Sequence, residues 1–340
     1  MKLSYFLILP VVSAGVIITQ QTPVLQDVEE NTIQSTTYEN IAHPVIGVHF
    51  STSYAIAAAR YQNGTTQDLS KVAGDLEYIE LMARWADQGR SVGMEQDVAV
   101  LADFMKKTRN AIETELGMRI TRIAPAFPQL PAYGNEAVRK ALSLARLAST
   151  RDHLVSDELA YTEFTAADAA LAHHVRSSAK DRKSRRKAAL TQHVLYVNFD
   201  NSSFSVAAMS LQSTNEERNV IRSDMNTQLG WWNMPVYDAP RAKFWARIQA
   251  MILDVVEPMP RPPSRVVLMG DHGADEEFKG VVTTAVWNKY EFDVELMLSP
   301  VRKEDATRLA ARGAAELAWR DDIRQREREV ARQKEEPIEL

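Results

Sequence analysis

Two segments of the sequence share a pattern that strongly restricts the fold: an apolar run, a short polar turn and a second apolar run. The first spans residues 45–61, with its turn at Ser51-Thr52-Ser53, and the second spans residues 194–209, with its turn at Asp200-Asn201-Ser202-Ser203. Apolar runs of this length favour strands, and Ser, Asn and Asp favour the turns between them. Each segment therefore predicts a hairpin of buried strands with hydroxyl, amide or carboxyl groups at its tip.

A similar order of elements follows each hairpin. After the first hairpin, the hydrophobic pattern predicts a helix over 96–116, a strand over 119–124 and a helix over 135–147. After the second hairpin, it predicts a helix over 241–256, a strand over 265–269, a helix beyond Gly273 and an Ala-rich helix over 304–319. Two similar halves predict a duplicated α/β fold of two lobes around a central cleft, in which the polar tips face one ligand. Loosely similar segments in an unduplicated α/β chain are the alternative.

Composition narrows the class of protein. The chain has 340 residues and a formal net charge of -5, so it is long enough for two domains and has no overall field that would attract nucleic acid. It contains no cysteine, which excludes disulfides, thiolate nucleophiles and sulfur ligands for a metal. Its seven histidines show no metal-ligand spacing, and no P-loop, Rossmann or hydrolase motif is present, so no metal site is predicted.

The N-terminus has the order of a secretory signal. Lys2 is followed by an apolar run, Tyr5 to Val12, and then by the small residues Ser13 and Ala14. This order predicts a signal peptide over 1–14, with an uncleaved anchor as the alternative, and a polar arm over 15–44. A protein with such a signal is expected in the secretory pathway and outside the cell, without membrane contact after cleavage.

Six segments, in chain order, carry features of one ATPase fold: Gly47–Tyr54, Val98–Pro128, Glu163–Ala167, Val194–Ser205, Val266–Asp271 and Arg312–Ala318. They resemble the first phosphate motif, a helix–strand–turn segment, the connecting motif, the second phosphate motif, the adenosine motif and the closing helix of the seventy-kilodalton heat-shock chaperone family. The resemblance implies a duplicated actin-like (ribonuclease H-like) ATPase fold, with halves over 45–190 and 191–319 and a charged helical tail over 320–340. The second half is short for this family, which implies a shortened outer lobe.

The resemblance also identifies the positions that would carry the chemistry. In the family, two aspartates position Mg²⁺, but here His49 and Asn198 stand at those positions, and only Glu163 remains as an acidic residue near the metal. The positions that would contact the nucleotide are Ser51, Thr52, Ser53, Asn201, Ser202, Ser203, Gly270 and Asp271. Histidine is a poor Mg²⁺ ligand, and a carboxylate such as Asp200 beside a phosphate costs about 1–4 kcal/mol per charge pair at about 4 Å.

These departures lead to two functional expectations. The first is a degenerate ATPase-like domain that can retain weak ATP binding, binds Mg²⁺ weakly or not at all, and hydrolyses ATP poorly or not at all. The second is a non-enzymatic binding or scaffold protein that retains the fold without a nucleotide. A peptide-folding chaperone is a weaker third reading, because no segment resembles the family's peptide-binding domain. The sequence indicates no particular protein partner.

Three further features, two glycosylation sequons, a basic run and a tryptophan-rich segment, each have a functional and a structural explanation. Asn63-Gly64-Thr65 and Asn201-Ser202-Ser203 are glycosylation sequons, and a glycan on Asn201 would fill the expected phosphate site. The basic run over 176–187 could bind a polyanion, although a solvated loop that joins the halves is favoured. Trp231 and Trp232 could belong to an exposed aromatic ligand surface that also includes Phe244 and Trp245, although core packing is favoured.

Overall fold

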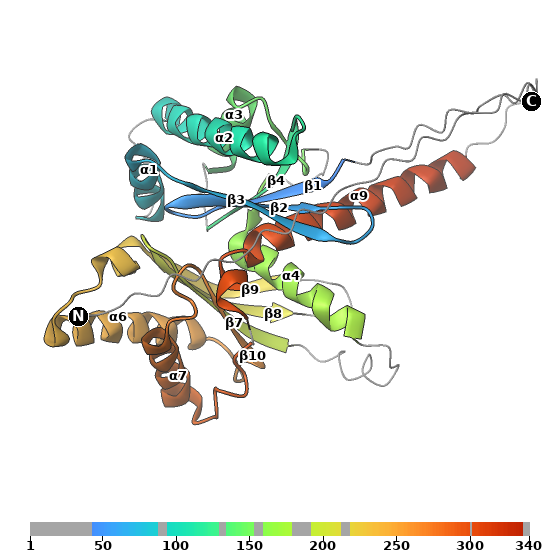
Figure 1. The fold of residues 1–340 in the computed structure, drawn as a ribbon. Helices are drawn as coiled ribbons and strands as arrows, with labels where there is room; N and C mark the ends of the chain where they lie inside the picture. The colour runs from blue at the N-terminus through green and yellow to red at the C-terminus, as the bar shows by residue number, and fades with distance from the viewer. Residues whose placement is uncertain are drawn as a thin grey trace, which may run out of the picture. The chain divides into compact units, whose positions relative to one another are not determined.

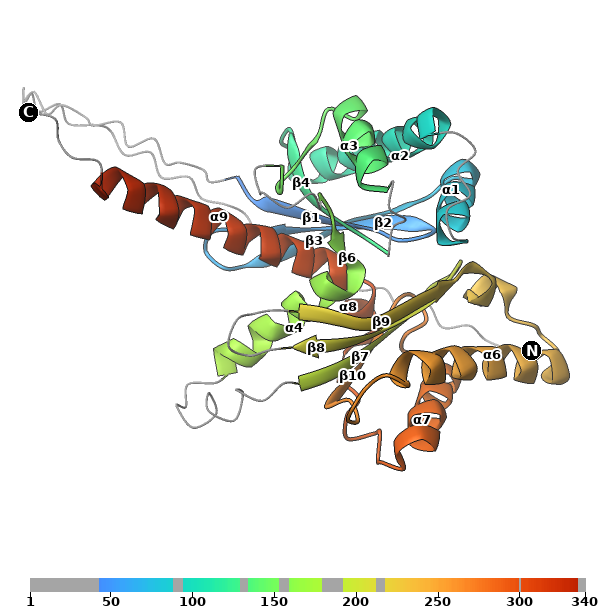
Figure 2. The ribbon, with the colours of Figure 1, turned by 180° about the vertical axis from the view of Figure 1, so that it is seen from behind.

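The structure is a computed structural model that describes residues 43–87, 94–128, 134–152, 159–178, 192–211, 218–299 and 301–335. In these ranges the chain is a mixed α/β protein with two sheets and helices against their faces (Figures 1 and 2). The signal peptide and nearly all of the polar arm predicted over 15–44 lie outside the described residues, as does most of the basic run. No helix within the described ranges is both long and apolar enough to cross a membrane.

The first sheet contains the first predicted hairpin. Its strands are β1 (Val45–Phe50), β2 (Tyr54–Arg60), β3 (Thr66–Ala73), β4 (Arg122–Phe127), β5 (Ala148–Ser149) and β6 (Tyr161–Thr162). They lie in the order β3-β2-β1-β4-β5, and β6 also pairs with β4. The strands β1, β2 and β3 form an antiparallel meander, and β4 is parallel to β1.

The second sheet has the same connectivity. Its strands are β7 (Gln192–Phe199), β8 (Phe204–Leu211), β9 (Arg218–Asn226) and β10 (Arg265–Met269), in the order β10-β7-β8-β9. An antiparallel meander of three strands is again followed by a strand parallel to the first of them. Both predicted hairpins and the predicted strand over 265–269 are therefore confirmed.

The helices form layers on both faces of the sheets (Figure 1). They are α1 (Leu76–Ala86), α2 (Met94–Leu116), α3 (Gly134–Leu144), α4 (Glu163–Ser178), η1 (Thr227–Leu229), η2 (Trp231–Asn233), α6 (Asp238–Val256), α7 (Glu276–Tyr290), α8 (Lys303–Ala306) and α9 (Leu309–Glu335). The first sheet packs against α1, α2 and α3, and the second against α6 and α7. A third apolar cluster joins α4 and α9 to strands of both sheets, so these two helices form an inner layer.

Several predicted boundaries were wrong. β4 occupies 122–127 rather than 119–124, and Pro125, which was expected in a turn, lies within it. Proline is tolerated in this strand because Pro125 lies between the segments that pair with β5 and β6. The predicted closing helix and helical tail are one continuous helix, α9, preceded by the single turn α8. β3 and α1 were not predicted.

The alternation of side chains along each strand determines which residues face the inner layer. Val48 in β1 points towards α1, α2 and α3, so its neighbour His49 points the other way. Val197 in β7 packs against α6 and α7, so Asn198 also points inward. The close approach of α9 to β1 depends on Gly47, because a Cβ there would lie 2.3 Å from the Ala311 carbonyl oxygen. Polar side chains from both sheets are thereby directed into one layer.

Two ion pairs attach α9 to the first sheet. Arg312 donates from Nε and Nη2 to the two carboxylate oxygens of Asp68 in β3, both at 2.7 Å. Arg60 in β2 lies 3.1 Å from Glu316, and both side chains are buried. Hydrogen bonds from Arg312 hold the pKa of Asp68 below its ordinary value, although burial partly opposes this shift.

We expect the Asp68→Asn variant to be less stable than the wild type at neutral pH by about 1 kcal/mol, because the pair is half-exposed and screened. A depressed folded-state pKa contributes stability above the unfolded value of about 3.9 and loses it as the pH falls through the folded-state pKa. The difference between variant and wild type should therefore disappear in acid. Urea unfolding between pH 7 and pH 2.5 measures this, with the exposed Asp103→Asn as control; a difference that persists at the acid end would contradict it.

Candidate functional site

The tips of the two hairpins contact each other directly. The first tip is Ser51-Thr52-Ser53, between β1 and β2, and the second is Asp200-Asn201-Ser202-Ser203, between β7 and β8. Ser51 donates to the Asp200 carboxylate at 2.7 Å, and the Thr52 hydroxyl lies 2.8 Å from that of Ser202 and 2.7 Å from that of Ser203. All these side chains are buried or nearly so. The hydroxyl groups expected to face a ligand therefore bond across the two sheets.

The Asp200 carboxyl group is the centre of this contact. Its side chain is fully buried and accepts four hydrogen bonds. The donors are the Ser51 hydroxyl at 2.7 Å, the Tyr54 hydroxyl at 3.0 Å, the Asn198 amide at 3.2 Å and the backbone N–H of Asp271 at 3.1 Å. Two donors come from the first hairpin, one comes from β7, and one comes from Asp271, the second residue after β10. One carboxyl group thus connects three chain segments that are distant in sequence.

Tyr54 completes the first hairpin's side of this contact. Burial, followed by the nearby Asp200 and Asp271 carboxylates, raises the pKa of Tyr54 well above its ordinary value. The phenol is therefore protonated at neutral pH and donates to Asp200. The Lys71 ammonium group lies 3.8 Å from the centroid of the Tyr54 ring, which it covers.

A second buried cluster surrounds Glu163, the first residue of α4. Its carboxylate accepts from the Ser205 hydroxyl at 2.8 Å and the Asn198 amide at 3.2 Å, and it lies 3.1 Å from Nε2 of His49. The position at a helix N-terminus also favours a negative charge. Asn198 bonds to both Glu163 and Asp200, so the two clusters form one continuous buried network. His49 Nδ1 and Asn198 Oδ1 are buried without a hydrogen-bond partner among the described residues.

The segment after β10 closes the network on the second sheet. Gly270 has φ of +90°, and a Cβ there would lie 2.3 Å from Asn198 Oδ1, so no other residue fits without displacement. Asp271 accepts from the Asn201 amide at 2.7 Å and forms an ion pair with Lys71 of β3. Burial, followed by the charge of Asp200, raises the pKa of Asp271, and Lys71 opposes this shift. Gly270 and Asp271 therefore contact protein groups at the place expected for an adenosine.

The residues do not fit the phosphates of a nucleotide. Phosphate oxygens need donors, but Ser51 is bonded to Asp200, and Thr52 to Ser202 and Ser203. In the first tip, only the Ser53 hydroxyl has no hydrogen-bond partner among the described residues. The fully buried carboxyl of Asp200 lies between the tips and would repel an anion.

They do not fit Mg²⁺ either. The ion prefers several oxygen ligands in octahedral order, whereas the buried atoms left without partners in this network are His49 Nδ1, the Asn198 amide oxygen and the Ser53 hydroxyl, and none of them is a carboxylate oxygen. In the described ranges, no group of three or more His, Asp or Glu side chains is arranged to hold a metal ion.

Every residue predicted from the sequence lies in or beside this network. His49, Asn198 and Glu163 meet in one cluster, and Gly270 and Asp271 lie against the second tip. Ser51 and Thr52 bond across to the second tip, whereas the Ser53 hydroxyl is buried without a partner among the described residues and Asn201 bonds to Asp271. Sequence reasoning missed Tyr54, Lys71 and His272. Tyr54 had a usable signal, because it directly follows a polar tip and its hydroxyl needs a partner when buried. Lys71 lies in β3, which was not predicted.

The two sequons have different environments. Asn63 is exposed in the β2–β3 turn, where its side-chain oxygen accepts from the N–H and the hydroxyl of Thr65 at 2.9 and 2.7 Å. Asn201 is half-buried, donates to Asp271 and lies 2.9 Å from His272 Nε2. The folded chain therefore leaves Asn63 accessible to a glycan and uses both side-chain atoms of Asn201 internally.

The tryptophan-rich segment is divided between core and surface. Phe244 and Trp245 are buried, in agreement with the favoured core packing. Trp231 is half-buried and stacks on His272, with ring centroids 4.0 Å apart, while Trp232 is 59% exposed. Through His272, which contacts Asn201, this segment covers one side of the second tip.

The geometry thus defines a buried polar contact between two topologically similar sheets. Most of its side chains are buried, and its hydrogen bonds are made between protein groups. In comparisons with known proteins, no protein family and no curated protein matches the chain.

Proposed function

We propose that this protein is a non-enzymatic binding or scaffold protein built on the duplicated actin-like fold, and that the nucleotide cleft of that fold has become a permanent joint between the two halves. The repeated connectivity of the two sheets supports the duplication. The order of the six motif-like segments supports the relation to the heat-shock chaperone ATPase domain. In this proposal, the residues at the positions of the phosphate and adenosine motifs bond to one another and hold the two halves together.

The observation that carries the proposal is the position of Asp200. Its carboxyl group is fully buried and accepts hydrogen bonds from Ser51 and Tyr54 of the first hairpin. A nucleotide in this place would have to break both bonds, separate the tips and bring phosphate charge beside the carboxyl group. Each of these steps costs free energy, because buried donors would lose their partners. In the competing proposal, weak ATP binding at the same tips, the binding free energy of ATP would have to offset all of these costs.

Mg-ATP should therefore leave the thermal stability of the purified protein unchanged. A ligand present at 100 times its dissociation constant adds about 2.7 kcal/mol, which in a protein of this size raises Tm by roughly 4 °C. We expect no rise at millimolar Mg-ATP relative to magnesium sulfate at equal ionic strength, and no saturable heat in calorimetry. A saturable Tm increase, abolished in the Thr52→Val variant, would favour the nucleotide-binding alternative instead.

We also propose that the protein is exported. The support comes from the signal-like order of residues 1–14, from the absence of cysteine and from the exposed sequon at Asn63. A chain without thiols has nothing to oxidise in the secretory pathway. The internal use of Asn201 agrees with this reading, because a folded exported chain would carry a glycan at Asn63 without disturbing the joint.

A further inference from the structure

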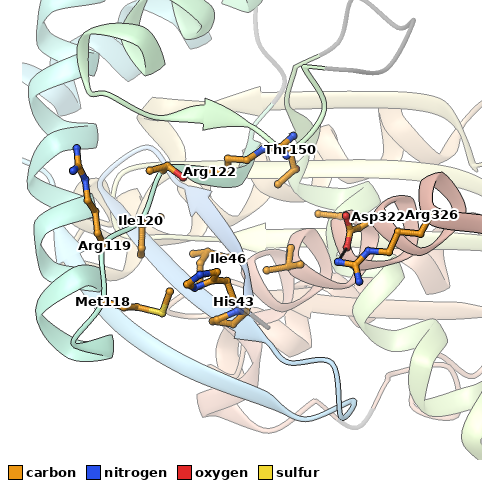
Figure 3. Close-up of a pocket in the computed structure, with 13 residues that line it drawn as sticks. His43, Ile46, Met118, Arg119, Ile120, Arg122, Thr150, Asp322 and Arg326 are labelled. Carbon is orange, nitrogen blue, oxygen red and sulfur yellow. Dashed lines mark hydrogen bonds and ion pairs between the residues drawn. The ribbon is translucent and has the colours of Figure 1, made fainter. Parts of the chain in front are cut away.

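A cavity that takes no part in the joint lies at the other end of β1. It has a volume of about 460 Å³ and lies between the start of β1, residues 118–122 and α9 (Figure 3). Protein interiors are close-packed, and few voids exceed the size of a water molecule. A cavity of this size falls in the range of small-molecule sites, which is about 300–1,000 Å³.

The walls of this cavity are mainly apolar. They include Val45 and Ile46 of β1, Met118 and Ile120 of the segment before β4, and Ala318 of α9. Figure 3 shows His43, Ile46, Met118 and Ile120 in the middle of the site, with Arg119 at one end and the Asp322–Arg326 pair at the other. An apolar body with a charged group at its end would match this distribution.

The charge around the cavity is positive in a protein whose net charge is negative. A second, more open depression adjoins the cavity and shares Met118 and Arg119 with it. Together the two are lined by five arginines and two carboxylates, which gives a formal charge of +3; these are Arg109, Arg119, Arg122, Arg146, Arg326, Glu113 and Asp322. The guanidinium groups of Arg119 and Arg146 have no ion-pair partner among the described residues. Such a local field attracts anions.

Arg146 occupies a backbone conformation that favours glycine. Its φ is 55°, two residues beyond the end of α3, where the Leu147 N–H bonds back to the Leu142 carbonyl. A left-handed conformation costs an L-residue about 1–2 kcal/mol, and glycine commonly occupies this position. An arginine here adds a positive charge beside the cavity at some expense in stability.

We propose that this cavity binds a small amphipathic carboxylate. Its apolar body packs against Ile46, Met118 and Ile120, and its carboxylate bonds to the Arg119 guanidinium, whose planar fork suits that group. Arg146 and Arg109 contribute to the attraction over a longer distance. The site goes beyond the joint proposed above and does not depend on it.

The test is a titration of the full-length protein, labelled with ¹³C on the methionine methyl groups, with decanoate, decan-1-ol and decyltrimethylammonium. Decanoate should shift the Met118 signal with a dissociation constant about tenfold lower than that of decanol, and the ammonium compound should bind most weakly. Arg119→Met should remove the tenfold advantage of decanoate and leave decanol unchanged. The exposed Arg261→Met, which changes the same charge away from the cavity, should have no effect.

Equal affinities for decanoate and decanol would overturn the proposal, as would an Arg119→Met variant that binds decanoate like the wild type. Absence of any Met118 shift at millimolar decanoate would also overturn it. Arg119 is exposed, so its replacement should leave the fold intact. The Mg-ATP experiment tests the joint alone, and its outcome therefore leaves this titration interpretable.

Discussion

Replacement of Asp200 by alanine should lower the free energy of unfolding by about 3–5 kcal/mol, the largest loss expected from any single change in the joint. The variant leaves the Ser51 and Tyr54 hydroxyls, the Asn198 amide and the Asp271 N–H without their acceptor. Each buried donor left unpaired costs about 1–3 kcal/mol, and relaxation or water entry recovers part of this. Urea unfolding followed by fluorescence and by circular dichroism measures the loss.

Two further variants separate the role of Asp200 from the general effect of an aspartate replacement. Asp200→Asn keeps the shape but turns one acceptor into a donor that faces donors, so it should lose less than the alanine variant, about 1–3 kcal/mol. Asp103→Ala removes a carboxylate that is 76% exposed in α2 and should change stability by less than about 0.5 kcal/mol. An Asp200→Ala protein as stable as the wild type, and newly able to bind Mg-ATP, would mean that Asp200 blocks a functional cleft rather than joining the halves.

The sequence identified the parts of the fold with strong local signals. Buried strands such as β7 and β10 read as continuous apolar runs, and α2 shows a helical period with a glycine at its end, so these elements were predicted. The edge strand β3 is largely polar and packs on one side only, which leaves a weak pattern. Helix α1 was missed even though Asp75 caps it by accepting from the Tyr78 N–H. In that case the signal was present and was not used.

The residues of the candidate site were predicted from the sequence, but the hydrogen bonds between them were not. Residues at the tips of two hairpins were expected to approach each other, and they do. Hydroxyl groups can donate to a phosphate or to a neighbouring hydroxyl with equal ease, so their type could not show that Thr52 would bond to Ser203. The distance between the tips is fixed by the packing of α4 and α9 between the sheets. That packing depends on contacts between distant segments, which local patterns do not contain.

Replacement of His49 by aspartate, which restores the residue type of the resembled magnesium motif, should destabilise this protein by about 2–4 kcal/mol at pH 7.5. The introduced carboxyl would be buried next to Glu163, whose carboxylate now lies 3.1 Å from His49 Nε2. Aspartate is shorter than histidine, so the two carboxylates would lie about 5 Å apart and repel by roughly 1–3 kcal/mol, and burial adds a desolvation cost. In a cleft that retained its magnesium geometry, the same substitution would instead add a ligand.

The pH dependence of this variant gives a second readout. Repulsion and burial raise the folded-state pKa of the introduced carboxyl above its unfolded value of about 3.9. The penalty is then fully present above the raised pKa and declines as the pH falls through it, so the variant should approach the wild type between pH 7.5 and pH 4. The exposed His43→Asp serves as control and should show neither the loss nor its pH dependence. If millimolar Mg²⁺ stabilised the His49→Asp protein, and Mg-ATP stabilised it further, the site would still hold the geometry of a nucleotide cleft, and the joint would be a reversible closure of that cleft.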